Sequence, residues 1–143
     1  MDQLPSWLLT QTAAHAHRLV NDGFAAAGAR GFHYRLLSSL LTDGPASQAT
    51  LGRRTKIHLS DMVAALNDLE ADGYVARSPD PDDRRRNVIT ITDAGRARAA
   101  ELATRATEVQ EALLAPLTAA ERAELTRLLT RLLTHHAGQP GRR

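Results

Sequence analysis

Apolar residues recur at helical spacing along the first half of the chain, in four stretches separated by glycine, proline and short polar runs. This spacing predicts helices at residues 4–27, 33–41, 48–54 and, starting at 58 or 59, up to 72. Pro5 suits the first turn of the first helix, where its missing N–H is no loss. Asp43-Gly44-Pro45 ends the second helix. The first half of the chain is therefore predicted to be helical.

The fourth helix carries one apolar stripe and follows a short helix after a tight turn. We expect its buried face to follow the i, i+3, i+4, i+7 pattern of an amphipathic helix, through Leu59, Met62, Val63, Leu66 and Leu69. Ser47 is a suitable N-cap for the short helix before it. The residues at 55–57 connect the two. This arrangement predicts a helix-turn-helix.

A hairpin and two further helices complete the pattern. Strand-like runs at 74–77 and 88–92 flank a loop with Pro79 and Pro81, which a hairpin tip tolerates because it has no ladder bonds to lose. A long helix follows at 94–114, and Thr118 to Glu121 forms a capping box that starts a last helix. The predicted fold is mainly α with a small β-wing, in the order α-α-α-α-β-β-α-α: a winged helix-turn-helix.

Composition narrows the class of protein. The chain has 143 residues, no cysteine, 43% apolar residues and a formal net charge of +2. Without cysteine, disulfides and thiolate metal sites are excluded. The N-terminus lacks the features of a signal peptide and no apolar run is long enough to span a membrane, so we expect a cytoplasmic protein that does not contact a membrane. The small, polar residues at 138–143 are expected to be a disordered tail.

The loop of the hairpin holds three consecutive arginines, Arg84, Arg85 and Arg86. Like charges at one tip repel one another, and double-stranded DNA, with one negative charge per ~1.7 Å of helix axis, is a natural complement. One alternative is an ordinary solvated charge run. Another is a loop in which the arginines pair with Asp80, Asp82 and Asp83. We interpret the tip as a DNA contact, with Arg84 in the minor groove.

The other expected DNA contacts come from the helix-turn-helix. The second helix of such a motif lies in the major groove, and the first braces it. The residues expected to face the major groove are His58, Ser60, Asp61, Ala64, Ala65 and Asp68. An alternative for Asp61 is that it only favours the helix dipole. The residues expected to contact the DNA backbone are Arg53, Arg54, Lys56, Arg77, Arg85 and Arg86.

On these residues the chain resembles the MarR (multiple antibiotic resistance regulator) family. The motifs that carry the resemblance are 66–75, the run from Pro79 to Arg85 with its Asp82-Asp83-Arg84, the T-x-x-G of Thr92 to Gly95, and 117–122. The resemblance implies an intertwined homodimer on a palindromic operator, with residues 1–32 and 94–137 for dimerisation and 33–93 for DNA binding. The residues expected at the dimer interface are Leu4, Leu8, Leu113, Leu117, Leu125, Leu129 and Leu132.

The resemblance also implies a small aromatic or phenolic effector, bound between the dimer helices and the DNA-binding lobe. By position, the expected pocket residues are Trp7, His15, Arg18, His33 and Arg35. Alternatively, Trp7 belongs to the dimer core and the histidines are exposed helix residues. No cofactor is expected, and no metal, because His15 and His17 diverge on a helix.

Two other classes of function fit these residues less well. A winged helix that docks onto proteins without specific DNA binding is the alternative to a regulator. An enzyme is not expected, because the sequence shows no nucleophile–base pair and no phosphate-cradling glycine loop. The sequence therefore predicts a homodimeric repressor that binds double-stranded DNA and is released by a small effector.

Overall fold

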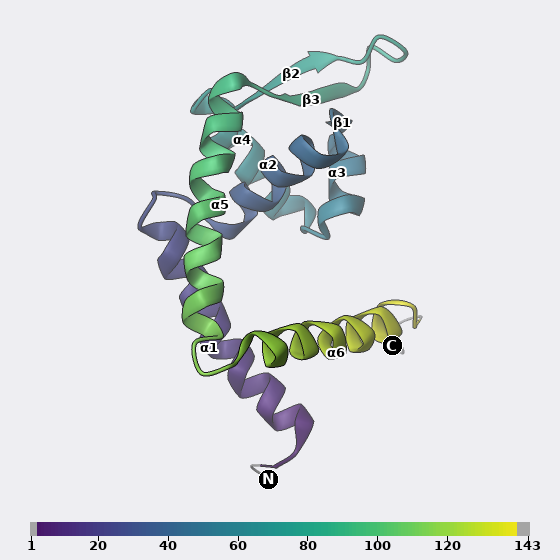
Figure 1. Cartoon of the computed structure of the whole chain (residues 1–143). Helices are drawn as coiled ribbons and strands as arrows, with labels where there is room; N and C mark the ends of the chain where they lie inside the picture. The colour runs from purple at the N-terminus through teal and green to yellow at the C-terminus, as the bar shows by residue number, and fades with distance from the viewer. Residues whose placement is uncertain (1–2, 140–143) are drawn as a thin grey trace.

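The computed structural model describes residues 3–139 and has six helices and three short strands in that range. In chain order they are α1 (Pro5–Ala25), α2 (Gly31–Asp43), β1 (Ala46–Ser47), α3 (Gln48–Thr55), α4 (Leu59–Ala71), β2 (Val75–Pro79), β3 (Asn87–Ile91), α5 (Asp93–Leu113) and α6 (Ala119–Ala137). Figure 1 shows a body built from α2, α3, α4 and the strands, with α5 running along it and α6 extending away from it. The predicted mainly helical winged fold is confirmed.

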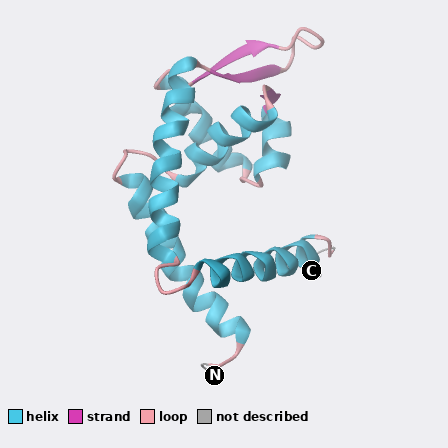
Figure 2. Ribbon diagram, viewed as in Figure 1, coloured by secondary structure: helices cyan, strands magenta, loops and turns pink. Residues whose placement is uncertain are grey.

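Two differences from the sequence prediction concern the edges of the body. The second helix is longer than expected, because it begins at Gly31 rather than His33 and continues to Asp43. A two-residue strand, β1, was not predicted. It pairs with β3 in the order β1-β3-β2, so the sheet has three antiparallel strands (Figure 2). The expected tail at 138–143 lies, from residue 140 on, outside the described residues.

The core sits where α2 crosses under α5 and packs against the helix-turn-helix. Leucine is the commonest residue in it, in keeping with a chain that has only 3% aromatic residues. The fully buried side chains are Leu36, Leu37, Leu51, Met62, Leu66, Ile89 and Leu102. They come from α2, α3, α4, β3 and α5, so the helix-turn-helix, the sheet and the first half of α5 share one core.

A compact joint connects the wing to α5. The Thr92 hydroxyl donates to the Gly73 carbonyl at 2.6 Å and accepts from the Gly95 N–H at 3.0 Å, which caps α5. A Cβ on Gly95 would lie 2.0 Å from the Tyr74 carbonyl oxygen, so this position tolerates only glycine. The T-x-x-G motif therefore has a structural purpose, because it lets α5 begin directly against the base of β2.

The last helix differs from the rest, because none of its residues is buried against the chain. Its attachment is made at one end, where Arg122 Nη1 contacts both carboxylate oxygens of Glu111 at 2.9 Å and Arg122 Nε donates to the Leu117 carbonyl at 3.2 Å. Figure 1 shows α6 running away from the end of α5 as an arm. None of the described helices is long and apolar enough to cross a membrane.

Candidate nucleic-acid interface

The helix-turn-helix owes its shape to caps at both ends of α3. The Ser47 hydroxyl accepts from the Thr50 N–H at 3.2 Å and caps the start of the helix. At the other end Lys56 takes a left-handed conformation, with φ of 59°, and its N–H donates to Gly52 at 3.0 Å. Ile57 is buried and anchors the turn to the core. The chain then enters α4 at a fixed angle to α3.

The inward face of α4 differs from the predicted one. Met62, Ala65, Leu66 and Leu69 are buried, at the i, i+3, i+4, i+7 positions, whereas Leu59 is 69% exposed. Val63, also predicted to be core, is 40% exposed. The predicted stripe was wrong because it assigned the larger Leu59 and Val63, rather than the small Ala65, to the buried face. The small Ala65 is the one that points at the packed helices, where a close approach leaves little room.

This rotation corrects the expected DNA-facing set. Ala65 is 4% exposed and belongs to the core, so it cannot reach a base edge. Ser60, Asp61, Ala64 and Asp68 are exposed, as is His58 at the N-cap position. The same face also presents Leu59, Val63 and Asn67, which the sequence reasoning missed. An assignment of Ala65 to the buried face would have placed these three residues on the exposed face of α4.

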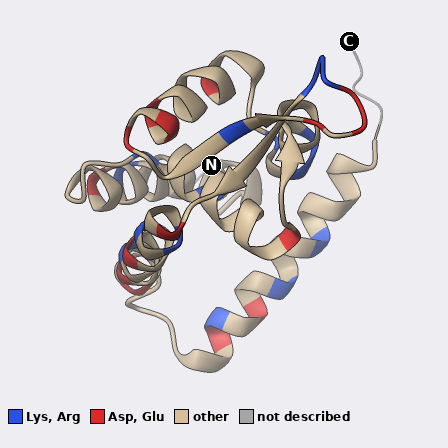
Figure 3. Ribbon diagram, turned by 90° about the horizontal axis from the view of Figure 1, so that it is seen from above, with Lys and Arg blue, Asp and Glu red and all other residues tan. Residues whose placement is uncertain are grey.

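The hairpin tip is held by its aspartates. Asp80 N–H donates to the Arg86 carbonyl at 2.8 Å, and the Asp80 and Asp83 carboxylates accept from the backbone N–H of Asp82 and Arg85 at 2.9 and 3.1 Å. The acids thus shape the loop that presents the basic residues. Figure 3 shows this acidic stretch followed by the blue basic positions at the tip.

The three tip arginines are not equivalent. Arg85 and Arg86 both approach Asp83, at 3.6 and 3.7 Å, although the Arg85 side chain is 95% exposed. Arg84 is exposed and makes no side-chain hydrogen bond or ion pair with the part of the chain that the structure describes. The alternative of a self-paired loop therefore holds in part for Arg85 and Arg86. Arg84 keeps its full hydrogen-bonding capacity for a partner.

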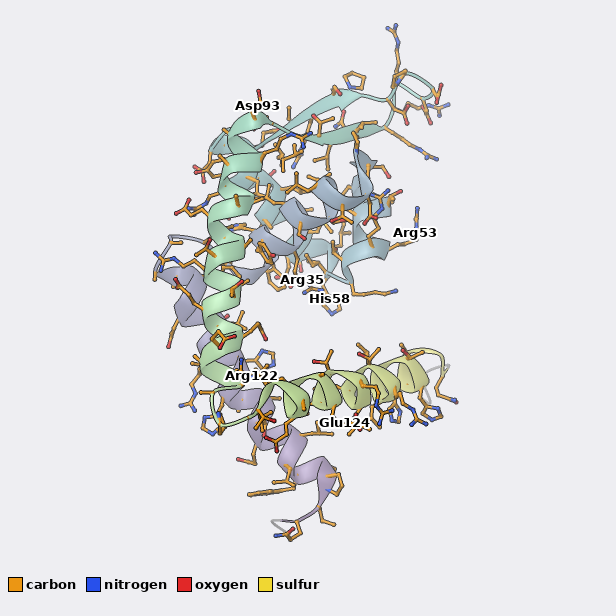
Figure 4. All side chains as sticks on the ribbon, viewed as in Figure 1. Arg35, Arg53, His58, Asp93, Arg122 and Glu124 are labelled. Atoms are coloured by element: carbon orange, nitrogen blue, oxygen red, sulfur yellow. The ribbon has the colours of Figure 1, made fainter. Side chains whose placement is uncertain are left out.

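Three arginines that are distant in the sequence line one cavity beside the wing. Arg53 of α3, Arg77 of β2 and Arg86 of the wing surround a space of about 550 Å³, together with the N-terminal turn of α3. We call this space the arginine groove. Figure 4 shows Arg53 projecting outward from α3. The groove gathers positive charge and a helix N-terminus at one place, which is a favourable environment for a phosphate.

Besides Arg85 and Arg86, three of the expected backbone contacts have partners within the chain, and one of them is Arg53, whose Nη2 donates to the Thr50 hydroxyl at 3.0 Å. Arg77 is only partly exposed, and it contacts Glu70 Oε2 at 3.4 Å and donates to Asn67 Oδ1 at 3.0 Å, so it braces β2 against α4. Arg54 donates to the Gly44 carbonyl at 3.2 Å. Lys56 is exposed. The prediction placed all of these on phosphates, and the structure gives Arg77 an internal role first.

A second cavity of about 930 Å³ lies between α1, α2 and α4, and we call it the interhelical cavity. Two of the expected pocket residues, His33 and Arg35, line it. Trp7, His15 and Arg18 do not, because they lie on other parts of α1, where His15 and Arg18 contact each other. The polar lining residues that the sequence did not predict for a pocket are His17, Asn21, Arg30, Asp68 and Asp72.

The expected interface leucines belong to the start of α1, the end of α5, the connection after it and α6, which lie at the end of the molecule away from the wing (Figure 1). Leu4, Leu8, Leu129 and Leu132 are 40–48% exposed, while Leu113, Leu117 and Leu125 are half-buried. More apolar side chains join them, namely Trp7, Leu9, Leu128 and Leu133. Among the described residues no group of three or more histidine or acidic side chains is arranged to hold a metal.

Comparison with known proteins gives three kinds of match. A family model described as MarR family matches residues 28–86. The HTH-type transcriptional repressor NicR of Pseudomonas putida is 31% identical over 97 residues, which is 68% of this chain and 61% of the relative. The alignment thus spans about three fifths of that relative.

Solved structures match over more of the chain. A probable transcriptional regulator from Pseudomonas aeruginosa is 33% identical, with a TM-score of 0.81 over 92% of this chain and 98% of that one. Bordetella bronchiseptica BpsR, whose DNA binding is regulated by 6-hydroxynicotinic acid, has a TM-score of 0.82 at 23% identity over 92% and 94%. A mutant MarR from E. coli complexed with operator DNA has a TM-score of 0.77 at 23% identity over 90% and 92%. The last two show a likeness of fold.

Proposed function

The chain belongs to the MarR family, and we propose that it is a transcriptional repressor that binds a palindromic DNA operator as a homodimer. The observation that carries the proposal is that Arg84 and the arginine groove gather basic side chains of the wing and α3 beside a helix-turn-helix whose α4 exposes small and polar residues. A helix with small and polar residues fits the major groove, and the flanking arginines fit the backbone and the minor groove.

The roles of the basic residues divide by their surroundings. Arg53 and Arg86 line the arginine groove and contact phosphates, which fix the register of the protein on the duplex. Arg84, which has no partner among the described residues, enters the minor groove. Its planar guanidinium is more weakly hydrated than an ammonium group, which favours entry into a narrow negative groove.

A homodimer is supported by the apolar faces that the chain leaves exposed. Among the described residues, most leucines of α6 and of the N-terminal turns of α1 stay exposed, and a soluble monomer rarely exposes so much contiguous apolar surface. A second copy would bury both faces. Two-fold symmetry would then place the two α4 helices about one helical turn of DNA apart, roughly 34–36 Å.

The interhelical cavity is our candidate for the effector site. Its walls combine apolar residues such as Val20 and Phe32 with Arg30 and His33, a lining suited to a small aromatic acid. The fold relative BpsR is regulated by 6-hydroxynicotinic acid, which has this chemistry. An effector that prefers a conformation with the wrong separation of the α4 helices would shift the population away from the DNA-bound form.

The test is a selection of bound fragments from a genomic library, followed by titration of the enriched sequence at several salt concentrations. We expect a palindromic consensus, an affinity that falls steeply with salt, and release by one of a panel of aromatic acids that includes 6-hydroxynicotinic acid. Enrichment of no sequence, together with unchanged affinity after Arg84→Glu, would favour a winged helix that binds proteins instead.

A further inference from the structure

One contact joins the wall of the interhelical cavity to the recognition helix α4. His33 of α2 and Asp68 of α4 are 35 residues apart in the sequence, and His33 Nε2 lies 3.2 Å from Asp68 Oδ2. Both residues line the cavity. The His33 side chain is 13% exposed and that of Asp68 is 58% exposed, so the contact is made at the cavity's edge.

The orientation of the imidazole is set by its own helix. The Arg30 backbone N–H donates to His33 Nδ1 at 3.1 Å, at the N-terminal end of α2. Nδ1 is therefore the acceptor, and Nε2 carries the hydrogen that is donated to Asp68. The ring thus links the start of α2 to the middle of α4.

A second residue of α2 that lines the cavity, Arg35, contacts α3, the first helix of the helix-turn-helix. Arg35 donates from Nη2 to the carbonyl of Thr55, the last residue of α3. Two polar side chains of α2 that line the same cavity therefore reach α4 and α3 respectively. These two contacts add to the shared core in holding the helix-turn-helix against α2, and the α2 side chain of each contact, His33 or Arg35, lines the cavity.

We propose that His33 and Asp68 are a positioning pair that sets the angle of α4 on the body, and that Asp68 does not read a base. The inference rests on the proposed function. Asp68 already accepts a hydrogen bond from His33, and a free carboxylate near phosphates would be repelled. A cavity ligand that takes the Nε2 hydrogen bond would leave Asp68 without its partner and loosen α4.

The experiment is a double-mutant cycle on the operator that wild-type protein selects. His33→Ala and Asp68→Ala are each expected to weaken binding by about 3- to 10-fold, the range for one hydrogen bond to a partly exposed carboxylate, and the double variant to be no weaker than either. Asp68→Asn, which keeps the acceptor oxygen, is expected to restore most of the affinity. Unfolding midpoints of all variants are measured alongside.

The readout that separates positioning from general damage is the spacing of the half-sites. Because the angle of α4 sets the separation of the recognition helices in the dimer, His33→Ala and Asp68→Ala should both reduce the penalty for adding one base pair between the half-sites. The preferred bases should stay the same. A loss of stability alone would lower the fraction of active protein and leave the spacing penalty unchanged.

Two matched controls sharpen the result. His17→Ala removes another histidine of the cavity, and Asp43→Ala an exposed acid at the end of α2, the helix that carries His33; neither side chain contacts the pair. Neither should alter the spacing penalty. Additive effects of His33→Ala and Asp68→Ala, or a changed base preference in Asp68→Ala alone, would overturn the proposal. If wild-type protein enriches no operator, the proposed function fails first, before any variant is compared.

Discussion

The winged body and the α6 arm differ in how far their apolar side chains are buried within the chain. In the body, seven large side chains from five elements are almost completely buried, so α2, α3, α4, β3 and α5 share one core. In α6, none of the 19 residues is buried, although its apolar positions keep regular helical spacing. The body therefore carries its own stability within one chain, whereas the arm has an apolar face whose burial requires another surface.

The largest expected effect comes from the arm. Leu129→Glu with Leu132→Glu replaces two exposed apolar side chains with charges. Each leucine buried in a dimer contributes about 1.5–3 kcal/mol, so we expect dimer affinity to fall by roughly a hundredfold or more, and operator affinity with it. Analytical ultracentrifugation measures the first and fluorescence anisotropy the second.

The matched control for this change lies on the body. Leu41 of α2 is 42% exposed, close to the values for the two arm leucines, but it lies outside the arm. Leu41→Glu should leave the protein dimeric. Equal losses from the arm and body variants would mean that exposed leucines of the chain are interchangeable, and the contrast between the two regions would disappear.

The contrast also explains which parts of the fold the sequence could predict. The helices, the hairpin and the capping box at Thr118 and Glu121 depend on local spacing, and each is present. The two-residue β1 was missed because its only support is pairing with β3. The phase of α4 was misjudged for the same reason, since burial of Ala65 in place of Leu59 depends on which helices cross it.

In the candidate site, too, the features that depend on neighbouring residues could be predicted, and those that depend on tertiary contacts could not. The basic tip could be predicted because three arginines are consecutive, and their loop is shaped by aspartates within the same few residues. The interhelical cavity could not, because it arises where α1, α2 and α4 cross. Trp7 and His15 were chosen from one helix alone, whereas the histidine of α1 that lines the cavity is His17.

The next expected effect tests how tightly the body is packed. Gly95→Ala would place a methyl group 2.0 Å from the Tyr74 carbonyl oxygen and 2.8 Å from Ile91 Cγ1. We expect a loss of about 1–3 kcal/mol in unfolding free energy, as for overpacking elsewhere. Gly52→Ala is the matched control, because no atom lies within 4 Å of its Cβ. In the α3 helix it should stabilise by about 0.5–1 kcal/mol. Chemical denaturation measures the unfolding free energy of both variants. An unchanged unfolding free energy for Gly95→Ala would contradict the close packing of α5 against the Tyr74 carbonyl.

A smaller effect on binding, and none on folding, is expected at the wing tip. Arg84→Ala should weaken operator binding by about 5- to 30-fold and reduce the salt dependence by about one counterion, while the unfolding midpoint stays the same. Arg105→Ala removes the same charge from α5, where Arg105 pairs with Glu108. Its effect should be small. An equal loss in both variants would assign the effect to net charge rather than to the tip.

The smallest expected effect concerns the pH dependence of the arm. The backbone N–H of Thr118, followed by its hydroxyl, holds the pKa of Glu121 below its usual value. The pKa of Glu121 is thus lower in the folded chain than in the unfolded one. Its contribution to stability is fully present above the unfolded pKa and is lost as the pH falls through the folded pKa.

The pKa of Glu124 is also lowered, but here the cause is the Arg127 side chain rather than a capping hydrogen bond. Thermal unfolding followed from pH 7 into the acid range should show a flatter pH dependence for Glu121→Gln and for Glu124→Gln than for wild type. High salt should remove the Glu124 difference, since an exposed ion pair is screened, and leave most of the Glu121 difference, since the capping hydrogen bonds persist. If salt abolished both differences alike, the capping box would contribute to the arm only through its charge.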